Sequence, residues 1–264
     1  MPTISVIIPA YQHLNEVLTC LTSLQVFASK TVDIQFLVQD DCSPSLDFRA
    51  VLPPCASSTA RNPVNLGFSG NCNAGAARAS GDILFFVNQD VFAVGEDADH
   101  QPLSQNWDIH LVNAFTDAQV GIVGAKLLFP DGRVQNAGGK FDGGCAPFHI
   151  GLGYSNHRYW EVNTPQEVSW TTGAALAIRR ELFNQLGGFD TIYERGYFED
   201  VELAVKARLA GYKVWYEPRC VLIHHTGTSG GSPTFAKNAE TFRKRWVDTK
   251  IIKPDITAIK ERWW

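Results

Sequence analysis

Three short, nearly uninterrupted apolar runs in the first third of the chain constrain its fold most strongly. They cover residues 4–8, 34–38 and 82–87. Unbroken hydrophobicity of this length is typical of strands that are covered on both faces of a sheet. Helix-like patterns at residues 15–27 and 70–79 separate the runs. Repeated strand–helix–strand units predict an α/β fold with a mostly parallel central sheet flanked by helices.

Polar side chains follow these runs directly. Pro9 is expected to end the first run, Asp40 follows the second, and the triplet Asn-Gln-Asp at 88–90 follows the third. Ligands of parallel α/β sheets bind beyond the carboxyl ends of the strands. Asp40 could accept hydrogen bonds from a base or a ribose there, or it could simply begin a turn. Asp90 offers the oxygen ligand that Mg²⁺ or Mn²⁺ requires beside a diphosphate, although turn chemistry explains the triplet almost as well.

The stretch GYFEDVELAVKARLAGY, residues 196–212, predicts a helix that begins with three carboxylates. These are Glu199, Asp200 and Glu202. Apolar residues then recur at helical spacing, and Gly211 stands where a left-handed C-cap is expected. A helix dipole tolerates acids at this end. Two adjacent acids directly after an aromatic pair exceed what a cap requires, so they are candidates for catalysis.

Two histidines, His224 and His225, follow the apolar CVLI and precede the glycine- and serine-rich TGTSGG. A histidine at a strand end, beside a loop that can close over phosphate, is a candidate metal ligand. A lone histidine is more often structural.

Composition limits the class of protein. The 264 residues are 45% hydrophobic and 19% charged, as in an ordinary globular protein. A net charge of -4 argues against nucleic acid as the main partner. The six cysteines are scattered without a CxxC pair, which favours reduced thiols in a cytosolic protein. Since no apolar segment has the length of a signal or a membrane span, we expect a soluble, cytoplasmic protein.

The rest of the chain is expected to continue one α/β domain, because internal repeats and low-complexity linkers are absent from the sequence. Residues 93–105 predict a polar surface loop, and the glycine-rich residues 121–153 predict short strands and turns. A strand is expected over 170–179 and a helix over 180–186. Residues 213–224 predict an extended stretch broken at Pro218.

The order and spacing of the motifs resemble the family 2 glycosyltransferases with the GT-A fold, most closely their rhamnosyltransferase-like branch. The resemblance covers nearly the whole chain, from SVIIPAYQ to about Trp246. The segments that carry it are SVIIPAY (5–11), VQDDCS (38–43), NLGFSGNCNAGAARASGD (65–82), FFVNQD, WTTGAALAIRRELFNQLGGFD, YFEDVELAVKARLAGY and HHTGTS (224–229).

This resemblance implies a nucleotide-binding half over residues 1–92, an acceptor-binding and catalytic half over 120–232, and a C-terminal helical tail over 234–264. Asp40 would contact the base of the donor. The other residues implied around the nucleotide and the donor sugar are Pro9, Ala10, Tyr11, Asn65, Gly67, Phe68, Asn73, Asn88 and Gln89. Those implied near the acceptor or donor sugar are Trp170, Thr172 and Gly173.

The same resemblance implies the metal ligands and the catalytic base. Asp90 corresponds to the last position of the family's DxD metal motif, in which Asn88 replaces the first Asp. Affinity for Mn²⁺ or Mg²⁺ would therefore lean on His224, which fits the pattern H-x-x-G-x-S, with His225 as the alternative. Asp200 matches the catalytic base of the family's ED motif, and Glu199 is the second choice.

These roles imply an inverting, metal-dependent glycosyltransferase of the hexosyltransferase type. A base takes the proton of the acceptor hydroxyl while the metal stabilises the departing nucleoside diphosphate. The expected partners are a nucleotide-sugar donor (a UDP- or dTDP-sugar, dTDP-rhamnose among them) and a glycan or lipid-linked acceptor of a bacterial surface polysaccharide. Whether the helix N-terminus lowers the pKa of Asp200 or the neighbouring acids raise it stays open at this point.

Two other functions compete with this interpretation. A nucleotidyltransferase would need a basic, glycine-rich phosphate loop near the N-terminus, and residues 11–16 contain neither glycine nor arginine. A non-catalytic module that binds sugar nucleotides or glycans is the alternative from a different class. The presence of Asp90, Asp200 and His224 argues against such a module.

The tail carries basic and aromatic residues, at 243–246 and again at 262–264. It could touch an anionic membrane that carries a lipid-linked acceptor, as a peripheral contact. More often, residues of this kind pack internally or lie at the solvated surface. The oligomeric state is left open by the sequence.

Overall fold

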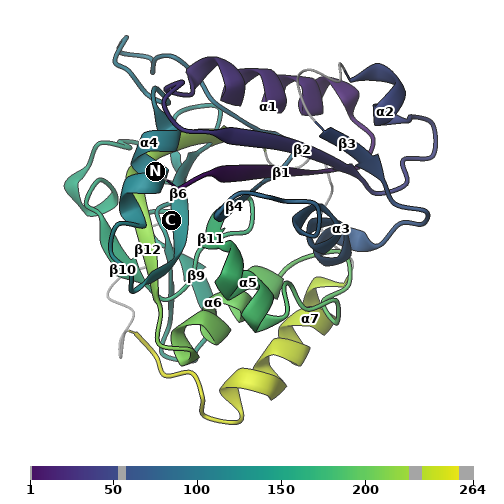
Figure 1. The fold of residues 1–264 in the computed structure, drawn as a ribbon. Coiled ribbons are helices and arrows are strands. Elements are labelled where there is room, and N and C mark those ends of the chain that lie inside the picture. The colour runs from purple at the N-terminus through teal and green to yellow at the C-terminus, as the bar shows by residue number, and fades with distance from the viewer. Residues whose placement is uncertain (1, 53–57, 226–233, 256–264) are drawn as a thin grey trace.

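The computed structural model describes residues 2–52, 58–225 and 234–255. Within them, a ten-stranded sheet has the order β10-β12-β6-β11-β4-β1-β2-β3, with β5 added to β12 and β7 to β6 (Figure 1). A separate pair, β8-β9, lies outside this sheet. The strands are β1 (Ile4–Ala10), β2 (Ile34–Asp40), β3 (Ser58–Arg61), β4 (Ile83–Val87), β5 (Val91–Phe92), β6 (Val120–Leu128), β7 (Val134–Asn136), β8 (Gly139–Phe141), β9 (Pro147–His149), β10 (Gln166–Val168), β11 (Ala175–Arg179) and β12 (Lys213–His224). The helices are α1 (Leu14–Phe27), α2 (Phe48–Val51), α3 (Gly67–Ala76), α4 (Trp107–Ala114), the 3₁₀ turn η1 (Trp160–Val162), α5 (Arg180–Leu186), α6 (Glu199–Leu209), α7 (Phe235–Phe242) and the π-helical η2 (Arg243–Val247).

The N-terminal half of the sheet is parallel, as the sequence predicts. β1 lies between β2 and β4 and runs parallel to both, and β3 continues the parallel order beyond β2. The other half is mixed, because β11 runs antiparallel between β4 and β6 while β12 runs parallel to β6. The α/β fold is therefore confirmed, with a reversal at β11 that the apolar runs did not indicate.

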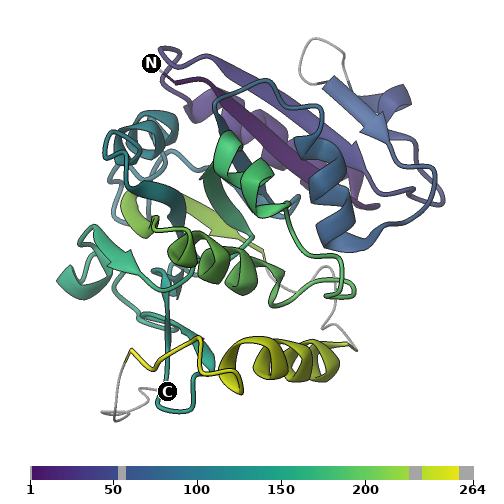
Figure 2. The same cartoon turned by 60° about the horizontal axis from the view of Figure 1, so that its bottom comes forward.

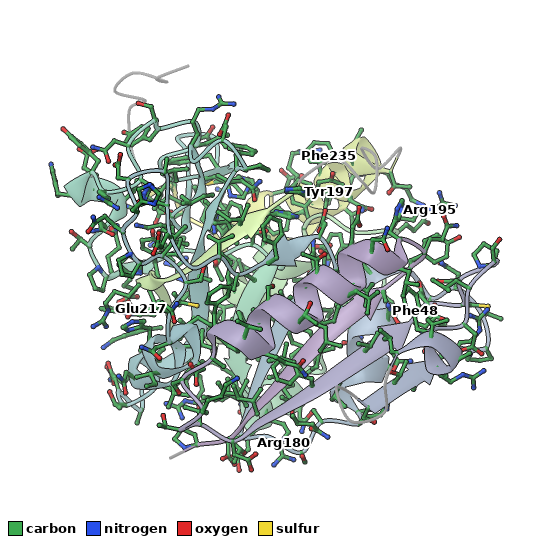
Figure 3. All side chains as sticks on the ribbon, turned by 90° about the horizontal axis from the view of Figure 1, so that it is seen from above. Phe48, Arg180, Arg195, Tyr197, Glu217 and Phe235 are labelled. Carbon is green, nitrogen blue, oxygen red and sulfur yellow. The ribbon has the colours of Figure 1, made fainter. Side chains whose placement is uncertain are left out.

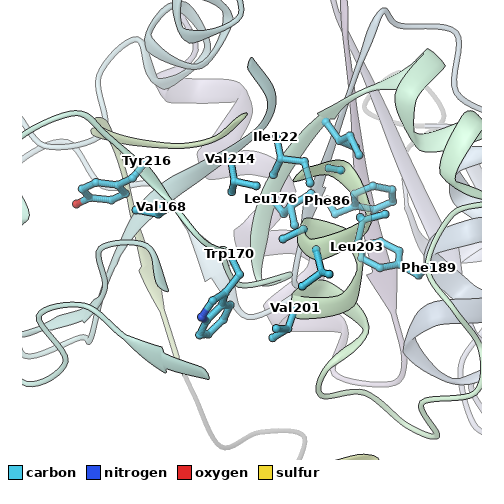
Figure 4. Close-up of a cluster of buried hydrophobic side chains, with 14 of the residues drawn as sticks. Phe86, Ile122, Val168, Trp170, Leu176, Phe189, Val201, Leu203, Val214 and Tyr216 are labelled. Atoms are coloured by element: carbon cyan, nitrogen blue, oxygen red, sulfur yellow. The ribbon is translucent and has the colours of Figure 1, made fainter. Parts of the chain in front are cut away.

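Alternate residues of each apolar run pack on opposite faces of the sheet and so belong to two different parts of the core. In β4, Leu84 and Phe86 join one buried cluster, while Phe85 joins the cluster on the opposite face. Helices α1 and α4 cover this second face (Figure 1), whereas α3, α5 and α6 contribute to the first. Figure 4 shows part of the first cluster, in which Phe86 and Leu176 of the sheet lie near Leu203 of α6. Burial on both faces explains why the runs lack polar interruptions.

Two expected boundaries are wrong. Pro9 does not end its strand, because β1 continues to Ala10; beyond Ile7 the strand pairs with β2 alone, so no amide hydrogen of Pro9 is needed on the β4 side. The strand expected over 170–179 begins only at Ala175. The N–H of Gly173 bonds to the Asp200 carboxylate 2.7 Å away instead of joining a strand ladder.

Several local expectations are confirmed. Helix α5 ends at Gly187, whose φ of 81° is the left-handed conformation expected of a glycine cap, and Gly211 follows α6 with a φ of 88°. Residues 93–105 form irregular backbone apart from a single bridge. The stretch over 213–224 is one strand, β12, whose pairing with β6 shifts register between Glu217 and Val221, around Pro218.

The C-terminal segment packs beside α6 (Figure 2). Its basic residues pair within the protein: Arg243 with Asp248, Lys244 with Glu240, and Arg245 with Asp190. Arg243 and Lys244 lie at the solvated surface and Arg245 is half-buried, while contact of the tail with a membrane stays a prediction. Residues 262–264 lie outside the described part of the chain. Among residues 2–52, 58–225 and 234–255, no helix is both long and apolar enough to cross a lipid bilayer. The five cysteines that the structure describes are free thiols.

Candidate active site

The ends of β1 and β4 are joined by one amide side chain. Gln89 Oε1 accepts a hydrogen bond from Tyr11 N at 2.8 Å, and Gln89 Nε2 donates to Tyr11 O at 3.2 Å. Tyr11 itself is 42% exposed, while Pro9 and Ala10 are buried at the strand end. The strand-end residues expected around the nucleotide therefore meet at one edge of the sheet.

Two adjacent carboxylates after β2 have separate internal partners. Asp40 is fully buried; one oxygen accepts from Ser43 and the other pairs with Arg61. Asp41, which the sequence analysis did not single out, accepts hydrogen bonds from the backbone N–H groups of Leu66 and Gly67 at 2.7 and 2.9 Å. Burial raises the pKa of Asp41 above its ordinary value. Asp41 thus positions the loop that leads into α3. Its place directly after Asp40 in the sequence was the signal that could have identified it.

That loop is further fixed by its own amide side chains. Asn65 Nδ2 donates to Asp41 O, and Asn65 Oδ1 accepts from Gly67 N. Asn73, in α3, exchanges two hydrogen bonds with the backbone of Phe189 at 2.8 and 3.0 Å. Phe68 contacts the ring of Phe189, with centroids 6.0 Å apart.

Asp90 and His224 meet although they lie 134 positions apart in the sequence. Asp90 Oδ1 is 3.2 Å from His224 Nε2, and His224 Nδ1 is 2.6 Å from Gln135 Oε1. The backbone N–H of His225 donates to Asp90 O, and its ring packs edge-on against Phe92. Between the two histidines, the geometry therefore favours His224 as a ligand beside Asp90. Residues 226–233, which complete the H-x-x-G-x-S pattern, lie outside the described residues.

His149 is a second histidine beside this group, and sequence reasoning missed both it and Gln135. Its Nδ1 is 3.1 Å from Asn136 Oδ1, and its ring meets the Trp170 ring edge-on at 4.9 Å. Burial, and then the nearby His224, lower the pKa of His149 to about 4, so it is neutral near pH 7. No local motif marks either residue, because β7 and β9 reach the site only through the tertiary fold.

The donor set fits a divalent cation that shares its shell with a substrate. Asp90 supplies a carboxylate oxygen and His224 an imidazole nitrogen, ligands that suit Mn²⁺. The side-chain oxygen of Asn88, two residues before Asp90, is buried and has no hydrogen-bond partner among the described residues. Within the described residues, no group of three His, Cys, Asp or Glu side chains could hold a metal on its own. Further ligands would have to come from phosphate or water, as is usual for Mg²⁺ in phosphate sites.

Asp200 and Glu199 begin α6 in different environments. Asp200 is partly exposed; its Oδ2 accepts from Gly173 N at 2.7 Å and its Oδ1 from Val201 N at 2.8 Å. Glu199 is 4% exposed, and within the part of the chain that the structure describes its Oε2 has no hydrogen-bond partner. Burial raises the pKa of both carboxyls, and the charge of Asp200 raises that of Glu199 further. At Asp200, burial thus outweighs the hydrogen bonds from backbone N–H groups, which lower its pKa.

The residues expected near the sugars lie in one segment, but their burial and their contacts differ. Trp170 is 4% exposed and donates through Nε1 to Lys140 O, so it forms a wall of the core. Thr172 precedes Gly173, where an added Cβ would lie 3.4 Å from the Asp200 Cβ and 3.5 Å from the Phe68 ring. On the other side, Ala174 O accepts from Asn88 N at 3.0 Å. The segment 172–174 therefore connects the turn that carries Asp90 with Asp200.

Comparison with known protein families identifies the family of this chain. The family model described as Glycosyl transferase family 2 matches residues 5–187. The chain belongs to glycosyltransferase family 2. The match includes the strand ends and the 172–174 segment, whereas α6, β12 and α7 lie beyond it.

Two relatives of this glycosyltransferase have names that refer to bacterial glycan assembly. The chain is 34% identical over 60% of its length to the O-antigen biosynthesis protein RfbC of Myxococcus xanthus. It is 30% identical over 47% of its length to the N-acetylglucosaminyl-diphospho-decaprenol L-rhamnosyltransferase of Mycobacterium tuberculosis. These likenesses support the rhamnosyltransferase-like branch. The chain spans 12% of the first relative and 45% of the second.

A solved structure supports the fold. GalNAc-T7, determined with UDP, GalNAc and Mn²⁺, matches with a TM-score of 0.72 over 94% of this chain and 48% of that one, at 19% identity. The glycosyltransferase therefore has the expected GT-A fold.

Proposed function

We propose that this glycosyltransferase moves a sugar, with inversion at its anomeric carbon, from a UDP- or dTDP-linked donor to a hydroxyl of a glycan or lipid-linked acceptor. The connection through residues 172–174 is the observation that carries the proposal. Asn88 N bonds to Ala174 O on one side and Gly173 N bonds to Asp200 on the other. The proposed base and the turn that carries the proposed ligand Asp90 both bond to this short segment, at the sheet edge where ligands of α/β folds bind.

In the proposed reaction, Asp200 removes the proton of the acceptor hydroxyl. Its raised pKa makes it a stronger base than a solvated aspartate, while two backbone N–H groups hold its carboxylate in one orientation. Direct attack of the hydroxyl oxygen on the anomeric carbon forms the new glycosidic bond as the bond to the diphosphate oxygen breaks. Attack from the face opposite the leaving group inverts the configuration.

Asp90 and His224 are the proposed ligands of Mn²⁺ or Mg²⁺, which when bound would offset the charge of the departing diphosphate. Gln135 Oε1 accepts a hydrogen bond from His224 Nδ1 and so fixes the ring with Nε2 toward Asp90. The relatives with O-antigen and decaprenol-linked chemistry in their names suggest a bacterial surface glycan as the product. One GT-A domain over residues 1–264, with the helical tail as part of its second half, is the proposed organisation.

Calorimetric titration with UDP, dTDP and GDP, with and without Mn²⁺, tests this function. We expect one nucleotide to bind more tightly with Mn²⁺, and Asp90→Ala to weaken that binding roughly tenfold or more, the loss typical even of residues that only support a metal ligand. Asp99→Ala is the matched control, because the Asp99 side chain is 82% exposed and carries the same charge. Mn²⁺-dependent affinity that is equal in Asp90→Ala and the wild type would rule out ligation by Asp90.

A further inference from the structure

The four residues before α6 share an unusual backbone conformation. Arg195, Gly196, Tyr197 and Phe198 have φ values of 59°, 107°, 75° and 78°. A left-handed conformation is energetically unfavourable for a residue other than glycine. Three such residues in one turn persist only where the surrounding structure determines them, and such strain gathers at functional sites. This turn leads directly into Glu199 and Asp200.

Helix α7 supplies hydrogen bonds that hold the turn. Asn238 is fully buried, and its Nδ2 donates to Glu194 O at 3.0 Å and to Gly196 O at 2.8 Å. Thr234, at the start of the same helix, donates from Oγ1 to Glu194 O at 2.7 Å. Because the turn is not helical, its carbonyl groups need hydrogen-bond donors from another part of the protein. One buried amide therefore satisfies carbonyls on both sides of Arg195.

Aromatic side chains of α7 fix the same turn. The Phe198 ring has its centroid 5.4 Å from that of Phe235 and 5.3 Å from that of Phe242. Tyr197 meets Phe235 edge-on at 5.3 Å, and Figure 3 shows this pair near Arg195. Ring pairs of this geometry add to the stabilisation that burial itself gives.

The opposite side of the turn meets the loop that Asp41 positions. A Cβ added at Gly67 would lie 3.6 Å from Arg195 N, and one added at Gly196 would lie 3.8 Å from Phe68 Cβ. Phe68 also approaches Gly173, the partner of Asp200. The turn is therefore held between α7 and the loop into α3, and any displacement of it moves the start of α6 relative to Gly173.

We propose that Asn238 is a positioning residue for the catalytic carboxylate. It acts through the left-handed turn at 195–198, whose geometry sets the distance between Asp200 and the Gly173 N–H. Its role as a positioning residue for transfer rests on the proposed function, in which Asp200 is the base. Its effect on the Asp200–Gly173 hydrogen bond does not require that function.

The test compares the wild type with Asn238→Ala by two measurements. The first is the amide signal of Gly173 in nuclear magnetic resonance spectra, with Asp200→Asn as the reference for an altered hydrogen bond. We expect Asn238→Ala to move this signal toward its position in Asp200→Asn. The second is steady-state transfer, in which we expect kcat to fall by up to about 100-fold, as a small misplacement of reacting groups can cause. KM for the donor and Mn²⁺-dependent nucleotide affinity should be unchanged.

Two controls separate positioning from general loss of stability. Glu240→Ala changes an exposed residue of the same helix, and Val17→Ala opens a cavity in α1 on the other face of the sheet. Neither is expected to move the Gly173 signal or kcat below the unfolding temperature. Thr234→Val, a milder change at the same turn, should shift both in the direction of Asn238→Ala and keeps the test valid if Asn238→Ala does not fold.

A Gly173 signal that stays at its wild-type position in Asn238→Ala and Thr234→Val would overturn the proposal. A fall in kcat no larger than that of Val17→Ala would do the same, leaving Asn238 a packing residue. If the wild type itself transfers no sugar with a donor that it binds, the proposed function fails, and the Gly173 signal alone still decides whether Asn238 positions Asp200.

Discussion

At the scale of single residues, the two acids of the ED pair differ in what they can reach. Asp200 is partly exposed and has both oxygens oriented by backbone N–H groups, whereas Glu199 is 4% exposed. A base must contact the proton that it removes. The geometry therefore favours Asp200 over Glu199 for that role.

We predict that Asp200→Asn nearly abolishes transfer and leaves donor binding nearly intact. The amide keeps the shape of the side chain and can still accept from Gly173 N, but it cannot take a proton. General bases contribute about 10²- to 10⁴-fold, so kcat should fall by that factor. Initial rates and a nucleotide titration measure the two effects. Equal losses of both would remove Asp200 from the role of base.

The raised pKa of Asp200 predicts the pH at which the rate of transfer falls on the acidic side of its pH profile. Below its pKa the carboxyl is protonated and cannot act as a base; above it, the base is available. Because burial raises this pKa, the midpoint of this fall in kcat/KM should lie above the value of about 3.9 that is ordinary for aspartate. Rates measured from about pH 3 to 8 at saturating Mn²⁺ check this. A midpoint at or below the ordinary value would contradict the burial argument.

At the scale of elements, helix α6 is tied to the C-terminal segment by a buried carboxylate. Glu202 is 1% exposed; it accepts from Tyr193 and, at 2.8 Å, from Trp246 Nε1. It also pairs with Lys206 and Arg245. The acid that the sequence presents as part of a charged helix start is therefore a structural anchor, whereas Asp200, two residues earlier, faces the site.

We expect Glu202→Ala to lower the free energy of unfolding by about 3 kcal/mol, because breaking a buried ion pair leaves its partners without compensation. Urea unfolding followed by circular dichroism measures the change. Glu240→Ala is the control: Glu240 and its partner Lys244 have exposed side chains, so its effect should be within about 1 kcal/mol. Similar losses in the two variants would show that the Glu202 network contributes little.

At the scale of the whole molecule, the second half of the site depends on elements from the end of the chain. The family match ends at residue 187, yet Asp200 begins α6, His224 ends β12, and Asn238 lies in α7. β12 lies between β6 and β10 in the sheet. Farther along the chain, Asp255 Oδ2 accepts hydrogen bonds from Phe141 N and Ser169 Oγ. The C-terminal segment is thus an integral part of the second half of the fold.

Four features could be predicted from the amino-acid sequence: the apolar strands of the parallel half, the polar residues at their ends, the acidic start of α6 and the glycine after it. Each depends on local periodicity or on the conformation of one residue type, so neighbouring letters are enough to predict it. The sequence also carried the family resemblance, which the family match and the fold confirm. The roles of the individual site residues stay predictions.

Which of these residues contact one another depends on the folded chain. The contacts of His224 with Gln135, of Gly173 with Asp200 and of Asn238 with Gly196 join residues 89, 27 and 42 positions apart. Residues as bulky as Tyr197 and Phe198 do not favour a left-handed backbone, so no local pattern predicts their turn. It exists because α7 and the loop into α3 hold it from both sides, and long-range packing outweighs local preference there.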